Sequence, residues 1–67
     1  MELLIIKTKG GYLRIKPDEF LAVTLEKASV FPMAELAHVQ GLAAGARNRG
    51  FGDVAVKKLV LTEEDLS

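Results

Sequence analysis

Few side chains in this sequence could carry out a reaction. His38 is the only histidine among the 67 residues, and there is no cysteine. A histidine that acts as a general base needs an orienting partner and a nucleophile within reach. Ser29 and Ser67 are the only serines, and neither is a recognisable nucleophile beside His38. We therefore expect His38 to face solvent or an interface, and we predict no catalytic residue, no cofactor and no enzymatic activity.

The acidic and glycine-rich stretches do not predict a metal or phosphate site. Glu63, Glu64 and Asp65 are adjacent carboxylates, without the spaced, preorganised ligands of a calcium loop. We interpret them as a solubilising end of the chain. Gly10 and Gly11 follow a lysine, but the GxxxxGK spacing is missing and no helix follows.

Residues 49–56, RGFGDVAV, resemble the central consensus of the RNA-recognition motif, in which exposed aromatic rings stack on bases. Phe51 fits the first ring position, but Asp53 and Val56 stand at the second and third. Nine basic residues balance nine acidic ones, so the chain lacks the positive excess that neutralises phosphates. A helix-stop glycine, a core phenylalanine and a turn explain the same letters. A weak nucleic-acid patch is kept only as an alternative, made of Arg47, Arg49, Phe51, Lys57 and Lys58.

Residues 32–50, PMAELAHVQGLAAGARNRG, predict the main helix. Pro32 suits the first turn, where its missing N–H has no partner. Gly50 suits a left-handed stop, and Arg47 and Arg49 complement the negative end of the helix dipole, which repels anions. At 100° per residue, five apolar residues form a stripe that predicts packing on a sheet: Leu36, Val39, Leu42, Ala43 and Ala46.

Another side of this helix carries almost no side chains. The residues are Ala37, Gly41, Ala44 and Gly45. Each interior glycine costs about 1 kcal/mol relative to alanine, and close approach of another backbone would explain two of them. We treat these four residues as a candidate helix-contact face, with an exposed alanine-rich surface as the alternative. Charged and polar residues interrupt the segment, so it is not a membrane span.

Four stretches predict strands. Residues 3–8 are apolar on both faces from Leu3 to Ile6, which is typical of an interior strand. Gly10 and Gly11 predict a hairpin to residues 12–15, with the positive φ values that primed turns need. Residues 20–25 predict a third strand, although a helix over residues 18–28 is a rival interpretation. Residues 54–61 predict the last strand.

The last strand has an irregular pattern, because Lys57 and Lys58 are adjacent. Either a bulge lies there, or Leu59 and Leu61 lie on the face opposite the helix and form a candidate sheet-face contact. The predicted fold is a single α+β domain over residues 1–67, in the order β-β-β-α-β. Its sheet is antiparallel or mixed, with one helix packed on one face.

The chain also resembles a loose group of small phage and prophage proteins of unknown function. The similarity rests on the glycine turn within residues 7–12, on the stretch LEKASVF at residues 25–31, which fits L-x-x-A-x-V-F, and on the helix and final strand that follow. Pro32 stands where that group commonly has a helix-capping serine. The resemblance implies a compact α+β unit with no known catalytic residues.

A single helix can cover only one face of a sheet, yet 49% of the residues are hydrophobic. Surplus apolar surface indicates a partner or a second copy. We therefore expect a homo-oligomeric interaction or structural module, with a dimer favoured. A small regulatory adaptor that binds another protein is the alternative, and the weak nucleic-acid binder is a third hypothesis. Residues 1–9, MELLIIKTK, do not have the pattern of a signal peptide, so a cytoplasmic location is expected.

Overall fold

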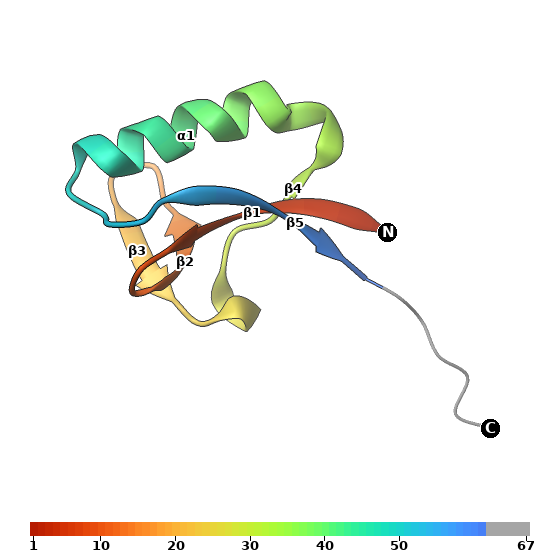
Figure 1. Cartoon of the computed structure of the whole chain (residues 1–67), viewed down its shortest axis with the longest axis horizontal. Coiled ribbons are helices and arrows are strands. Elements are labelled where there is room, and N and C mark those ends of the chain that lie inside the picture. The colour runs from red at the N-terminus through yellow and green to blue at the C-terminus, as the bar shows by residue number, and fades with distance from the viewer. Residues whose placement is uncertain (62–67) are drawn as a thin grey trace.

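The computed structural model describes residues 1–61, and these form one sheet with a helix on one face (Figure 1). The sheet contains β1 (Glu2–Thr8), β2 (Gly11–Ile15), β3 (Phe20–Val23), β4 (Phe31–Pro32) and β5 (Ala55–Val60). The helices are α1 (Leu36–Asn48) and two 3₁₀ turns, η1 (Leu25–Lys27) and η2 (Met33–Glu35). The predicted α+β fold is confirmed, and every strand pair described is antiparallel. None of these helices has the length and apolar character to cross a membrane.

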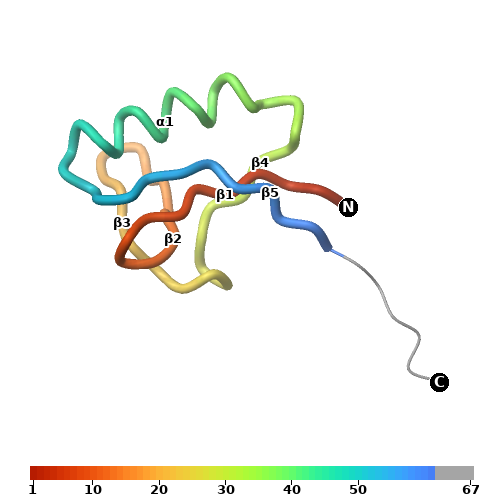
Figure 2. The backbone as a smooth tube through the Cα atoms, in the orientation of Figure 1, coloured from red at the N-terminus to blue at the C-terminus, as the bar shows by residue number. Residues whose placement is uncertain are grey.

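Strand β1 is the centre of the sheet (Figure 2). One edge pairs with β5 along residues 2–7. The other edge is shared, because β4 pairs with Leu3 and Leu4 and β2 pairs with Lys7 and Thr8. Strand β3 then pairs with the far edge of β2. The apolar run in β1, which predicted an interior strand, therefore lies between neighbours on both sides.

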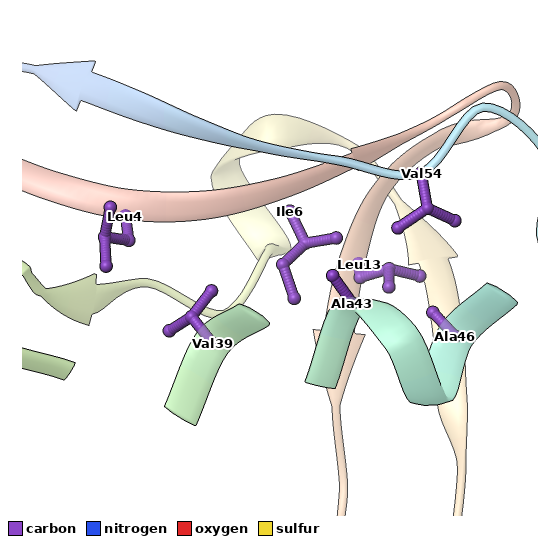
Figure 3. Packing of buried hydrophobic residues seen from close by; sticks show 7 residues of the cluster. All are labelled: Leu4, Ile6, Leu13, Val39, Ala43, Ala46 and Val54. Carbon is purple, nitrogen blue, oxygen red and sulfur yellow. The ribbon is translucent and has the colours of Figure 1, made fainter. Parts of the chain in front are cut away.

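The main core lies between α1 and the sheet (Figure 3). Leu4, Ile6 and Leu13 point from the strands towards small side chains on the helix. Of the predicted helix stripe, Val39, Ala43 and Ala46 are fully buried and Leu42 is half-buried against them, as expected. Leu36 differs from the prediction: it is the first residue of α1 and is 42% exposed.

The start of the helix was predicted wrongly and its end correctly. Pro32 lies in β4, paired with Leu3 in extended geometry (φ −67°, ψ 153°), and η2 separates it from α1. Proline restricts φ but not ψ, so pairing with β1 decides its conformation. At the other end Gly50 has φ +96°. The Gly50 N–H donates to the Arg47 carbonyl (3.1 Å) and the Phe51 N–H to that of Ala46 (3.2 Å), which is a Schellman stop.

The hairpin between β1 and β2 forms where predicted, but not with a primed turn. Thr8 pairs with Gly11, so Lys9 and Gly10 are the two central residues of the turn. Neither has a positive φ, whereas type I′ and II′ turns need one at the first central residue. Gly11 itself has a φ of +138°. Gly11 serves another purpose. A Cβ atom there would lie 2.7 Å from the Val23 carbonyl oxygen of β3, so only glycine lets the two strands come this close.

The segment between β3 and α1 differs most from the prediction. Residues 20–23 form a strand, which decides against a helix over residues 18–28, but the chain turns into η1 at Leu25. Ser29 then runs beside β2: its N–H donates to the Leu13 carbonyl (3.0 Å), and its Oγ accepts from the Ile15 N–H (2.8 Å). The short strand β4 was not predicted, because two residues show no periodicity. Residues 62–67, with the predicted acidic end, lie outside the described residues.

Replacing Gly11 by alanine tests the close approach of β2 to β3. We expect Gly11→Ala to lower the free energy of unfolding by at least about 1–3 kcal/mol, because the new methyl group meets backbone and φ is strained. Gly10→Ala is the matched control: its Cβ would lie 3.9 Å from the Ala22 Cβ, an ordinary contact, and we expect a change below about 1 kcal/mol. Urea unfolding of both variants measures this, and equal effects would contradict it.

Candidate functional site

The sheet face opposite α1 is the first candidate site, and the strand register decides which residues lie on it. Side chains alternate between faces along a strand, and directly paired residues share a face. Because Leu4 and Ile6 point to the helix, their neighbours point away from it. We call this surface the far face. It carries Leu3, Ile5, Lys7, Tyr12, Arg14, Leu21, Val23, Ala55, Lys57 and Leu59.

The far face has only a partial cover within the described residues. Ile5 is 2% exposed, although it does not belong to the core under α1. It forms the floor of a pit of about 160 Å³ whose walls include Tyr12, Leu25 and Leu59. Leu25 belongs to η1, which is held to β2 by a hydrogen bond from the Arg14 guanidinium to the Lys27 carbonyl (3.4 Å). Leu25 is itself 42% exposed, so η1 shields the middle of this face and leaves the rest half-exposed.

The strands contribute charge of one sign to the far face. Lys7, Arg14 and Lys57 lie there, whereas the carboxylate of the sheet, Glu2, lies on the helix side with its salt-bridge partner Lys58 (3.2 Å). The Lys7 Nζ lies 5.9 Å from the centre of the Tyr12 ring. The far face is therefore apolar with a cationic rim, a combination that suits an acidic and apolar ligand.

The predicted sheet-face contact can now be placed. Strand β5 pairs with β1 in a regular register without a bulge, so the bulge interpretation is wrong, and a contact through this face stays a prediction. Leu59 pairs with Leu3 and lies on the far face. Leu61 follows the strand, 45% exposed, and its N–H donates to the Met1 carbonyl (2.8 Å).

The candidate helix-contact face divides into two parts. Ala37, Gly41 and Ala44 are exposed, and nothing lies within 4 Å of where a Gly41 Cβ would be. Gly45 points elsewhere, because its Cβ would lie 3.8 Å from the Phe20 ring, inside the molecule. The four residues therefore do not form one continuous outer surface. Gly45 lies beside Phe20, whereas no contact in the structure explains why position 41 is a glycine.

The residues of the alternative nucleic-acid patch are spread over the molecule. Phe51 packs against the core, which leaves no ring free to stack on a base. Lys57 and Lys58 lie on opposite faces of the sheet. The Arg47 guanidinium donates to the Val54 carbonyl (3.0 Å), whereas the Arg49 guanidinium lies over the Phe20 ring. No single surface therefore collects these five side chains.

A second candidate site was not predicted from the sequence. A groove of about 670 Å³ runs along one flank of α1, between the helix and the ends of β2, β3 and β4. We call it the flank groove. Its lining residues are Ile15, Lys16, Pro17, Phe20, Ser29, Val30, Phe31, His38, Leu42 and Arg49. They come from five separate segments, so no spacing in the sequence could have grouped them.

Two aromatic contacts shape this groove. The Arg49 guanidinium carbon lies 4.1 Å from the centre of the Phe20 ring, a cation–π contact. His38 meets Phe31 edge to face, with ring centres 6.3 Å apart and an interplanar angle of 74°. His38 is exposed, as predicted, and lines the groove. Among residues 1–61, no group of histidines and carboxylates could hold a metal ion.

The position of Arg49 after the last turn of α1 does not prevent it from binding an anion. The helix dipole opposes negative charge there by about 0.3–1 kcal/mol. Arg49 is exposed, and an exposed ion pair is itself worth only about 0.2–1 kcal/mol, so the two effects are of similar size. The last carbonyls also accept bonds from the Schellman stop at Gly50 and Phe51. The helix dipole therefore does not by itself exclude an anion at the Arg49 guanidinium, which lies over the Phe20 ring.

Comparisons with protein-family models, with curated proteins and with solved structures found no match to this chain. The resemblance to small phage and prophage proteins stays a prediction.

Replacing Gly41 tests whether the outer side of α1 contacts another backbone. We expect Gly41→Ala to raise the free energy of unfolding by about 1 kcal/mol, because alanine favours the helix and nothing obstructs its methyl group. Gly45→Ala is the matched control, with the same gain in helix propensity and an ordinary contact to Phe20. Urea unfolding and light scattering are the measurements. A loss of stability or of molar mass specific to Gly41→Ala would instead reveal a close helix contact.

Proposed function

We propose that the protein is a small interaction module, without a reaction of its own, that docks another polypeptide on the far face. The observation that carries this proposal is the unequal cover of the sheet. Helix α1 buries one side, whereas among residues 1–61 the other side has only the short turn η1 over it. Leu25 of η1 is 42% exposed, and five large apolar side chains around it are only half-buried: Leu3, Tyr12, Leu21, Val23 and Leu59. Apolar surface of this kind, rimmed by charge, is typical of a protein interface.

The charge of the far face favours a partner that is acidic as well as apolar. Lys7, Arg14 and Lys57 would pair with carboxylates that flank apolar side chains on the partner. Two copies packed face to face would bring the same cations together, which is unfavourable. A different, acidic polypeptide therefore fits this face better than a second copy does. A cytoplasmic location remains a prediction that belongs to this proposal.

Self-association is the second candidate function, and it would use a different surface of the protein. Met1, Val60 and Leu61 are 81%, 54% and 45% exposed at the ends of β1 and β5. No described strand pairs with the outer edge of β5. An edge-to-edge pair centred on Lys57 and Lys58 would set these lysines against their copies, and like charges on paired strands are destabilising. The homo-oligomer predicted from the sequence thus stays a prediction, with these apolar ends as its support.

Two neighbouring lysines provide a matched test of the docking face. Lys57→Glu reverses a charge on the far face, and Lys58→Glu reverses one on the helix side of the same strand. We expect Lys57→Glu to weaken association at least about tenfold, or 1.4 kcal/mol, while Lys58→Glu has little effect. Light scattering over a concentration series measures self-association, and capture from a native cell extract measures binding of a different partner.

The outcomes separate the two candidates. A monomer at all concentrations, together with a captured protein lost in Lys57→Glu alone, supports an adaptor. A concentration-dependent dimer that both variants leave intact supports self-association through the apolar ends. Equal loss of the captured protein in both variants would contradict docking on the far face.

A further inference from the structure

We infer that the flank groove is a binding site for a small amphipathic carboxylate, with an apolar body along α1 and its anionic group at Arg49. This site is separate from the far face, because the groove opens on the helix side of the sheet. The inference therefore does not depend on the proposed docking function. It rests on the volume of the groove, the character of its walls and the state of the Arg49 side chain.

The walls of the groove are apolar and already fixed by packing. Ile15, Phe20, Phe31 and Leu42 each pack on the core under α1 and each turn part of their surface to the groove. The volume of about 670 Å³ lies within the range of roughly 300–1,000 Å³ that small-molecule sites occupy. An aliphatic or aromatic body of moderate size would bury apolar surface there without rearranging the fold.

The Arg49 guanidinium is oriented by an aromatic contact and has no polar partner among residues 1–61. Its contact with the Phe20 ring holds it at the groove, 4.1 Å from the ring centre. No hydrogen bond or ion pair joins it to another side chain or carbonyl within residues 1–61. A guanidinium presents its N–H donors as a planar fork that matches a carboxylate in two parallel bonds. An oriented fork with unused donors is what a carboxylate site requires.

The remaining polar groups of the groove also suit an anion. Lys16 adds a second cation, and no aspartate or glutamate is among the lining residues. The Ser29 Oγ already accepts from the Ile15 N–H (2.8 Å), which leaves its hydroxyl hydrogen to donate. His38 lies beside Phe31 in the first turn of α1, away from Arg49 at the other end of the helix, where it would contact the apolar body of the ligand. The lining is therefore apolar, with hydrogen-bond donors and cations but no carboxylate.

Decanoate, 1-decanol and acetate are suitable probes, used below the micelle concentration of decanoate. They separate the two parts of the inference, because decanol keeps the apolar body and acetate keeps the anion. Two-dimensional ¹H–¹⁵N NMR titration of the full chain measures both affinity and location. We expect decanoate to bind at least tenfold more tightly than either other probe, with the largest amide shifts around Phe20, Phe31, Leu42 and Arg49.

Variants at Arg49 and Lys57 complete the test. Arg49→Gln should weaken the binding of decanoate at least tenfold. Arg49→Lys keeps the charge but loses the planar fork, so its affinity for decanoate should lie between those of the unaltered chain and Arg49→Gln. Lys57→Gln removes a cation from the far face and should leave the affinity unchanged.

Equal affinity for decanoate and decanol, or shifts centred on Ile5, Tyr12 and Leu59, would overturn the inference. So would full decanoate affinity in folded Arg49→Gln. Should that variant not fold, the comparison of decanoate with decanol on the unaltered chain decides alone.

Discussion

The burial of β1 on both edges and both faces is the constraint on which the rest of the structure depends. Leu4 and Ile6 are covered by α1, and Ile5, between them, is covered from the other side by η1 and its neighbours. Each of these side chains gains about 1.5–3 kcal/mol from burial, so neither cover can be removed without cost. The two covers are unequal, however, because a helix of 13 residues faces a turn of three. The half-exposed far face follows directly from that difference.

Two glycines with positive φ allow the other elements to reach β1. Gly11 lets the backbone of β2 approach β3 where a methyl group would meet a carbonyl oxygen. Gly50 ends α1 and turns Phe51 into the core, which brings Val54 and then β5 back alongside β1 (Figure 2). The helix stop at Gly50 thus places β5, which pairs with one edge of β1. The small side chains of Ala43 and Ala46 are fully buried and let α1 pack closely on the sheet.

The two candidate sites lie on opposite sides of the sheet and differ in form. The far face is broad, with Lys7, Arg14 and Lys57 around apolar side chains, which suits a polypeptide. The flank groove is an open groove of about 670 Å³ with one oriented guanidinium, which suits a small molecule. Because the two sites lie on opposite sides of the sheet, a ligand at one would not block the other.

The sequence by itself determined the α+β class, the central position of β1, the buried side of α1 and the glycine stop at Gly50. All four follow from local periodicity or from backbone conformations that one residue type accepts. The tertiary structure alone decided that Pro32 is extended, that Leu25 turns over the far face and that the primed turn is absent, because pairing with distant strands overrides local preference in short segments. It also decided the sites. Alternation along β5 sends Lys57 and Lys58 to opposite faces, and the flank groove joins Arg49 to Phe20 and Phe31, which only folding brings together.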